Sequence, residues 1–230
     1  MPYYFYDATY ILVLIGALIS MLASWNVQNT FNHYSRVRNS RNLTAQEAAQ
    51  RILHSAGIYD VRIEKIRGNL TDHYSPTEKV LRLSDQVYGS TSVAAIGVAA
   101  HECGHAIQHQ EGYAPLKLRS LSVPLANLGS RLSWPVIVLG LMFGLSGLLE
   151  IGILLFVFVV AFQVITLPVE FDASHRALRI LEEGQYFGLQ EMQGAKKVLT
   201  AAALTYVASL ISAVLQLLRL ILLTRRNDDR

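Results

Sequence analysis

Residues 131–168 form the most apolar stretch of the sequence and read RLSWPVIVLGLMFGLSGLLEIGILLFVFVVAFQVITLP. As one helix, these 38 residues would be about 57 Å long, nearly twice the thickness of a bilayer core. Two helices, at about 133–148 and 151–168, would each fit the core better. We therefore expect a transmembrane hairpin over 131–168 that turns near GLSGLLE, with Glu150 at the tip. The alternative is a single tilted or kinked helix.

A second apolar stretch lies near the N-terminus, where residues 8–25 read ATYILVLIGALISMLASW without a charge. Its length predicts a transmembrane helix. Aromatic residues stand at both ends, as they do at membrane interfaces: Tyr3, Tyr4, Tyr6, Tyr10 and Trp25. A cleaved signal peptide is the alternative, but no Lys or Arg precedes the stretch and Asp7 does.

A third apolar stretch, residues 198–223, reads VLTAAALTYVASLISAVLQLLRLILL and is long enough to span. Gln216 and Arg219 make its end more polar, and we expect Arg219 to reach toward the interface. An interfacial or bundle-packed helix is the alternative.

The composition supports a membrane protein. Hydrophobic residues make up 52% of the 230 residues and charged residues only 16%, against about 25% charged residues in soluble domains. The net charge of +3 comes from basic residues that flank apolar segments, which disfavours a nucleic-acid partner. Cys103 is the single cysteine, so the sequence has neither an intrachain disulfide nor a cysteine-rich metal cluster.

The more polar region between the apolar stretches predicts a small α/β portion. Residues 43–58 read as a helix that begins with a capping box, Thr44 with Glu47. Residues 60–66 and 79–84 alternate as strands do, and GNLTDHYSPTE links them as turns. The second strand could offer an edge to an extended substrate. Ser92 and Gly112 bound a further helix.

The predicted fold class is therefore a mainly α integral membrane protein with a small α/β portion. We divide the chain into six segments: an N-terminal transmembrane helix (1–26), the α/β portion (27–130) with a motif helix (92–111), a transmembrane hairpin (131–168), a helix and connection (169–197), a C-terminal transmembrane helix (198–223) and a polar tail (224–230).

The motif helix carries VAAHECGHAIQHQEG (98–112), which contains the pattern His-Glu-x-x-His. His101 and His105 lie on one helix face, so that two imidazole nitrogens can bind one metal at about 2.0–2.1 Å. Glu102 would then lie beside a zinc-activated water and act as its general base. A chance run of polar residues is the alternative, but two histidines and a glutamate in an apolar helix need a reason to be desolvated.

A third ligand must come from elsewhere in the chain. His109 lies about 12 Å along the helix from His101 and cannot share its metal. The segment LPVEFDASHRALRILEE (167–183) follows the apolar hairpin, and Pro168 suits the start of a new helix or a break in one. A hairpin returns the chain to the side that it left, so this segment would face the motif helix. It offers three ligands: Glu170, Asp172 and His175.

Several segments resemble the YugP-type neutral zinc metallopeptidases of bacterial membranes: LTDHYSP, VLRLSDQVYGSTSVAAIGVAAHECGHAIQHQEGYAPLKLRS, GILLF, TLPVEFDASHRAL and AAALTYVASL. The resemblance covers about residues 5–223. It implies that the α/β portion (27–130) is a zincin-like metalloprotease portion and that 169–197 contains the third-ligand helix. The chain would then be a membrane-embedded gluzincin in which His101, His105 and Glu170 bind one Zn²⁺ and Glu102 is catalytic. EFDAS is also similar to the Glu-x-x-Ala-Asp helix of HtpX-like proteases, except that Ser174 replaces the aspartate that supports a ligand histidine there.

Other polar residues have weaker claims to the site. They could support a ligand or stabilise an oxyanion, or could be ordinary surface residues: Asp172, His175, Arg176, His73 and Tyr113. Cys103 points away from the histidine face, and we expect it to be a packing residue without a role in the site.

The expected function is a zinc-dependent metalloendopeptidase that hydrolyses peptide bonds near the membrane surface. Its partners would be the lipid bilayer and a peptide or membrane-protein substrate, without nucleic acid; a membrane-protein partner or a second copy of the chain stays open. A non-catalytic scaffold stabilised by zinc is the alternative, and it would need four protein ligands. A transporter would place ionisable groups at mid-span, where this sequence has none.

The basic residues predict the orientation. Ten of them flank the spans on the side of the motif helix: Arg36, Arg38, Arg41, Lys117, Arg119, Arg131, Arg176, Arg179, Lys196 and Lys197. The other side would carry Arg225, Arg226 and Arg230 if the last stretch spans. The positive-inside rule therefore predicts a multi-pass protein of the cell membrane whose active site faces the cytoplasm.

Overall fold

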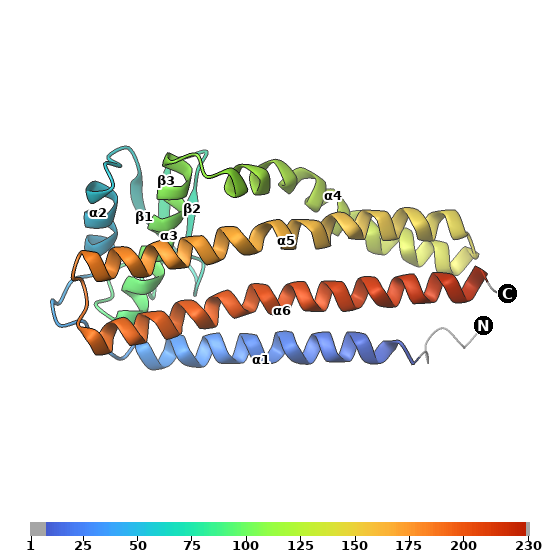
Figure 1. The fold of residues 1–230 in the computed structure, drawn as a ribbon, viewed down its shortest axis with the longest axis horizontal. Helices are drawn as coiled ribbons and strands as arrows, with labels where there is room; N and C mark the ends of the chain where they lie inside the picture. Colours follow the sequence, from blue (N-terminus) through green and yellow to red (C-terminus); the bar gives the residue numbers. More distant parts are fainter. Residues whose placement is uncertain (1–7, 229–230) are drawn as a thin grey trace. The chain divides into compact units, whose positions relative to one another are not determined.

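The computed structural model describes residues 8–228, with side chains up to Thr224, and contains six helices and three strands in that range (Figure 1). The helices are α1 (Tyr10–Tyr34), α2 (Ala45–Ser55), α3 (Val93–Gln110), α4 (Ala114–Phe143), α5 (Ser146–Glu183) and α6 (Leu189–Asp228). The strands are β1 (Arg62–Ile66), β2 (His73–Ser75) and β3 (Val80–Ser84). The predicted class, a mainly α membrane protein with a small α/β part, is confirmed.

Some predictions concern residues outside this description. Tyr3, Tyr4, Tyr6, Asp7 and Arg230 lie outside the described residues, as do the side chains of Arg225 and Arg226.

The chain forms two compact units. Of the described residues, the bundle unit comprises 8–24, 117–167 and 205–228, and the sheet unit comprises 25–116 and 168–204. These bounds cut through α1, α4, α5 and α6, since each of these helices continues from one unit into the other. The units therefore do not coincide with the six segments expected from the sequence, which were divided at the ends of apolar runs.

The bundle unit holds the apolar parts of four helices. Within the described residues, α1, α4, α5 and α6 are each long and apolar enough to cross a membrane. The hairpin turns at Gly144, whose φ of +66° suits a residue without a side chain, and Leu145. Glu150 lies in the first turns of α5 and not at the tip, because the helix already begins at Ser146.

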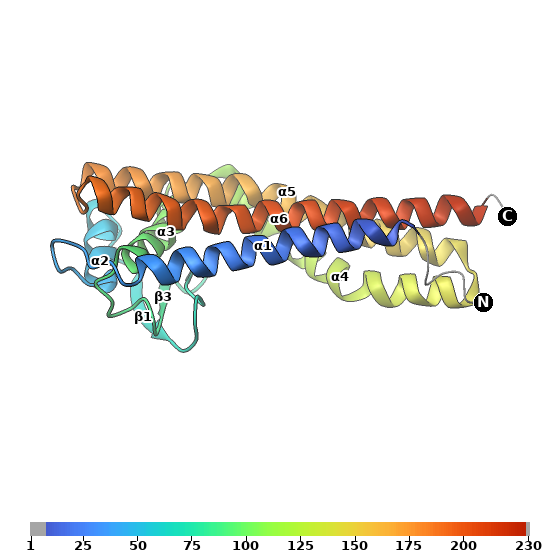
Figure 2. The same cartoon turned by 90° about the horizontal axis from the view of Figure 1, so that it is seen from below.

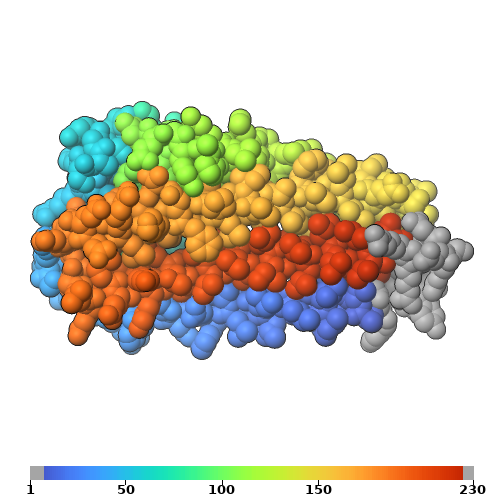
Figure 3. All heavy atoms as spheres, in the orientation of Figure 1, coloured from blue at the N-terminus to red at the C-terminus, as the bar shows by residue number. Residues whose placement is uncertain are grey.

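Two helices approach closely in the bundle unit. A Cβ on Gly16 would lie 3.1 Å from the Cα of Ser212, and the Ser212 hydroxyl donates to the Gly16 carbonyl at 2.7 Å. Such small residues allow membrane helices to pack closely. Figure 2 shows α1 beside α6, and Figure 3 shows the two helices as adjacent blue and red bands on one face. The Arg219 guanidinium lies over the Tyr10 ring, 4.9 Å from its centroid.

The prediction that Pro168 starts or breaks a helix is wrong. Pro168 lies inside α5, which is continuous from the apolar hairpin to Glu183. Proline removes one backbone donor, but packing against neighbouring helices makes it tolerable in helices of membrane proteins. The consequence is that Glu170 lies on the same helix as the second arm of the hairpin.

The sheet has the strand order β1-β3-β2, with β1 parallel and β2 antiparallel to β3. The turn-rich link therefore contains a third strand, β2, that was not predicted; its three residues are too few for a clear alternation. The hypothesis that the strand near 79–84 offers an edge is wrong, since β3 is central and its side chains at both ends are buried.

The local signals that begin α2 and α3 are confirmed. Thr44 and Glu47 form the reciprocal capping box, and the Ser92 hydroxyl accepts from the Ala95 amide at 3.2 Å. The two helices pack on each other through small and branched side chains such as Ile52, Ile96 and Ala99, which belong to the core of the sheet unit. This core fixes the motif helix α3 against α2 and the sheet, which leaves its opposite face to α5.

Candidate metal centre

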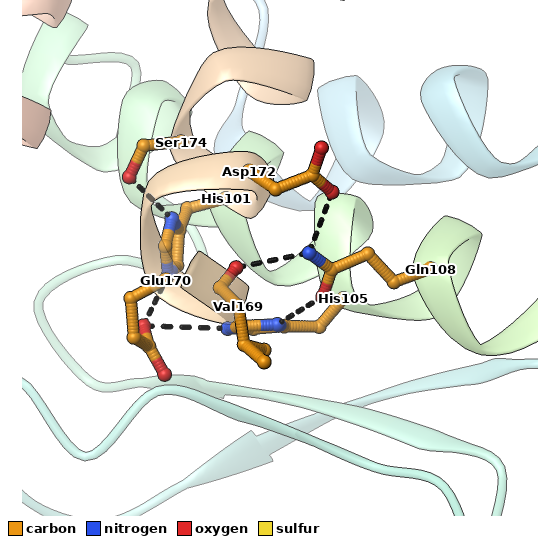
Figure 4. A network of polar contacts seen from close by, with 7 residues as sticks. All are labelled: His101, His105, Gln108, Val169, Glu170, Asp172 and Ser174. Carbon is orange, nitrogen blue, oxygen red and sulfur yellow. Dashed lines mark hydrogen bonds and ion pairs between the residues drawn. The ribbon is translucent and has the colours of Figure 1, made fainter. Parts of the chain in front are cut away.

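Three side chains from two helices converge in the sheet unit. His101 and His105 project from consecutive turns of α3, and Glu170 projects from α5 (Figure 4). The Glu170 Oε2 atom lies 3.3 Å from His101 Nε2 and 3.6 Å from His105 Nε2. Of the candidates for the third position, the structure brings Glu170 to the two histidines.

The three residues fit a zinc ion. Two ligands bound at about 2.0–2.1 Å to a tetrahedral zinc lie about 3.3 Å apart. The observed separations of 3.3 and 3.6 Å from Glu170 are close to that value, and all three ligand atoms lie within 4.8 Å of one another. Glu170 is only 2% exposed, and a carboxylate so deeply buried needs positive charge beside it.

Gln108 orients His105. Its amide nitrogen donates to the Val169 carbonyl at 2.9 Å and to Asp172 Oδ2 at 2.8 Å. Both partners are acceptors, so the amide oxygen must face His105 Nδ1, which lies 3.0 Å away. His105 therefore carries a proton on Nδ1, and its Nε2 is free to bind a metal. Gln108 was given no role from the sequence, because the partners that orient its amide, Val169 and Asp172, lie 61 and 64 residues away along the chain.

Ser174 supports the other histidine. Its hydroxyl lies 3.1 Å from His101 Nδ1, one turn after Glu170 on the same helix. Ser174 thus lies where the aspartate of the HtpX-like motif would support a ligand histidine. The hydroxyl oxygen can accept a hydrogen bond from Nδ1–H as a carboxylate does, but it contributes no negative charge.

Asp172 supports the site indirectly. It contacts Gln108, and it accepts a hydrogen bond from Arg176 Nε at 2.6 Å. Arg176 also binds Glu111 at 2.6 Å, and its guanidinium lies 5.7 Å from the Tyr113 ring centroid. These contacts hold the end of α3 against α5 and thereby fix the orientation of Gln108.

The remaining weaker candidates make no such contacts. His175 is exposed, and His73 Nδ1 pairs with the Thr71 carbonyl at 2.9 Å. His109, which was excluded as a ligand, pairs with the Tyr74 hydroxyl at 2.9 Å. Cys103 is fully buried among core residues, and burial raises the pKa of its thiol well above the ordinary value.

Electrostatics at His105 reflect the convergence of carboxylates. Burial alone lowers the pKa of His105, but its contact with Glu170 and the charge of Glu102 outweigh burial and raise it. The site thus favours a positive charge, which either a proton or a metal ion can provide. Protons and metal would compete for the same nitrogen.

Glu102 is a buried carboxylate without a partner. It is 8% exposed and forms no hydrogen bond or ion pair with any residue in the range 8–228 that the structure describes. Its charge nevertheless acts on His105, so it lies near the candidate ligands. A buried carboxylate without a partner costs free energy of folding. Such unpaired buried groups are typical of functional sites.

Gly104 determines how closely α3 and α5 approach. A Cβ at this position would lie 2.6 Å from the Ala173 carbonyl oxygen, so the two backbones are in contact there. Gly104 precedes His105, and Ala173 lies between Glu170 and Ser174. The contact therefore lies among the residues that form the candidate centre.

Comparison with known proteins agrees with this geometry. Residues 9–225 match the model of a family described as "Putative neutral zinc metallopeptidase". The chain is 45% identical over 221 residues to the "Putative membrane protease YugP" of Bacillus subtilis (strain 168), covering 96% of this chain and 98% of the relative. No solved structure matches the chain.

The contact at Gly104 leads to a first prediction. Gly104→Ala should push α5 away from α3, lower the stability by about 1–3 kcal/mol and weaken zinc binding, measured by thermal unfolding and metal analysis in detergent. Gly97→Ala on the same helix is the control, because its Cβ would meet Ala195 Cβ at an ordinary 3.8 Å. Equal behaviour of the two variants would contradict the close contact.

The role of Gln108 leads to a second prediction. Gln108→Met keeps the length of the side chain but removes its hydrogen bonds, so zinc affinity should fall about 10- to 100-fold. The measurement is competition with a chelator of known affinity. Gln110→Met, at an exposed position of α3, should leave the affinity unchanged. Unchanged affinity in Gln108→Met would remove Gln108 from the support of His105.

Proposed function

Because this chain belongs to the family of neutral zinc metallopeptidases, we propose that it is a membrane-bound peptidase that hydrolyses peptide bonds close to the bilayer surface. His101, His105 and Glu170 would bind one Zn²⁺ per chain. Zinc at such a site supplies a Lewis acid that polarises a carbonyl and lowers the pKa of a water molecule to about 7. The chain's own residues would then position the reactants and move the proton.

Glu102 is the proposed general base, and the burial of its unpartnered carboxylate is the observation that carries the proposal. A carboxylate without a protein partner is available to accept a proton from the attacking water and to pass it to the departing amine. Gln108 and Ser174 would keep the Nε2 atoms of the two histidines directed at the metal through both steps.

The number of ligands favours catalysis over the alternative of a zinc-stabilised scaffold. A structural zinc site has four protein ligands, whereas a catalytic site keeps one position open. Within the described residues, the group that could hold a metal consists of His101, His105 and Glu170, without a fourth His, Cys, Asp or Glu.

The place of Glu170 on α5 favours a substrate at the membrane surface. Glu170 follows the apolar run that ends at Pro168 by two residues, which is about 3 Å along a continuous helix. A peptide segment that emerges from the bilayer would therefore lie close to the metal centre as soon as it leaves the apolar region. We propose membrane proteins, or peptides bound at the surface, as the substrate class.

Glu102→Gln tests the mechanism. This variant should retain zinc but lose at least about 100-fold in the hydrolysis of a fluorogenic peptide library, because an amide cannot accept the proton. Glu183→Gln, at an exposed position of α5, is the matched control and should behave as the wild type. Glu170→Ala should lose both zinc and activity. Full activity in Glu102→Gln would refute its role as the base, and full zinc content in Glu170→Ala would move the third ligand elsewhere.

Reporter fusions test the proposed cytoplasmic orientation of the sheet unit. Alkaline phosphatase, which is active only outside the cytoplasm, should be inactive when fused after Val80 and active when fused after Leu145, in the hairpin turn. Green fluorescent protein at the same sites should give the opposite pattern. A reversed pattern would place the active site on the outer side of the membrane and overturn the positive-inside argument.

A further inference from the structure

A groove lined mainly by polar residue types lies between α1 and α6 within the sheet unit, separate from the residues of the metal centre. Its volume is about 730 Å³, within the size range of small-molecule binding sites. The last turns of α1 contribute Asn29, Thr30 and His33, and the first turns of α6 contribute Lys196, Lys197 and Thr200. Figure 3 shows the beginning of α6, in orange, next to blue residues of α1.

The polar residues of both helices follow the helical repeat. Asn26, Asn29 and His33 lie on one face of α1, and Gln193, Lys196 and Thr200 lie on one face of α6. The opposite face of α6 is apolar and packs into the core of the sheet unit with Ala195, Val198 and Leu199. The polar residues of α1 and α6 are therefore not part of this core, and the residues of both helices line the same groove.

The groove is positively charged. Lys196 and Lys197 both line it, and no aspartate or glutamate does. Neither lysine forms a salt bridge with a carboxylate within the part of the chain that the structure describes. Two unpaired ammonium groups next to amide and hydroxyl side chains make a site for an anion with several acceptor oxygens.

The polarity of the groove changes along its α6 side. Following α6, the lining runs from Gln193 through the lysines and Thr200 to Ala201 and Leu204. The apolar end is the one toward which α6 continues as a candidate membrane span. On α1, Asn26 directly follows the exposed Trp25, a residue type that is enriched at membrane interfaces. On the α6 side, the groove is thus basic where the helix leaves the apolar run and apolar toward that run, and Asn26 of α1 lies at the same end as Ala201 and Leu204.

From these observations we propose that the groove binds the headgroup of an anionic phospholipid. The phosphate diester would lie between Lys196, Lys197 and the hydroxyl and amide groups of the two helices, and the glycerol end would point toward Leu204. Basic pockets between membrane helices are known to hold such headgroups. A water-soluble anion would match the charge but would not use the apolar end of the groove.

The test is titration of the full-length protein in detergent with a fluorescent phosphatidylglycerol. The double variant Lys196→Gln/Lys197→Gln should bind the lipid at least about tenfold more weakly, because each lysine beside an anionic headgroup contributes to the binding affinity. Lys196→Arg/Lys197→Arg keeps both charges and should bind within about twofold of the wild type. Lys117→Gln removes a lysine outside the groove and should have no effect. Both groove lysines are exposed, and zinc content and elution volume check the fold of each variant.

Competition identifies the source of the phosphate. Unlabelled phosphatidylglycerol should displace the probe, whereas phosphatidylcholine and millimolar inorganic phosphate should not. Displacement by inorganic phosphate would assign the groove to a free anion and overturn the lipid proposal. Equal competition by phosphatidylcholine, or wild-type affinity in the double glutamine variant, would also overturn it.

Discussion

The candidate metal centre depends on the backbone contact between α3 and α5 at Gly104 and Ala173. A methyl group at position 104 would clash with the Ala173 carbonyl oxygen. Because Gly104 has no side chain, the two helices can approach until Glu170 reaches both histidines. The hydrogen bonds from Gln108 to Val169 and Asp172 then join the same two helices a turn away. The packing that holds the helices together is therefore also the packing that assembles the ligands.

This arrangement couples the membrane-spanning part of the chain to the chemistry. Glu170 belongs to a helix that begins in the hairpin, whereas the histidines belong to a helix embedded in the core of the sheet unit. The third ligand is thus delivered by a helix that the bilayer would anchor. A change that shifts α5 relative to α3 would move Glu170 relative to the two histidines.

Much of the architecture could be predicted because it rests on local signals. The hairpin follows from the length of the apolar run, α2 from its capping box, and the histidine pair from spacing on one helix. The choice of Glu170 among Glu170, Asp172 and His175 came from family resemblance, since spacing alone left all three open. The third strand, β2, is too short to show a pattern, and its existence depends on pairing with β3. The continuity of α5 through Pro168 depends on tertiary packing, which overrides the local tendency of proline to end a helix. The roles of Gln108 and Ser174 also depend on partners about 60 to 70 residues distant, so no local pattern reveals them.

If two histidines of α3 and one glutamate of α5 bind a single zinc ion, X-ray absorption at the zinc edge of the purified protein will show it. We expect one zinc per chain, surrounded by two imidazole nitrogens at about 2.0–2.1 Å and by oxygen ligands, without sulfur. A protein that carries no zinc after purification with metal present, or a spectrum that lacks the scattering of two imidazoles, would rule out this metal centre.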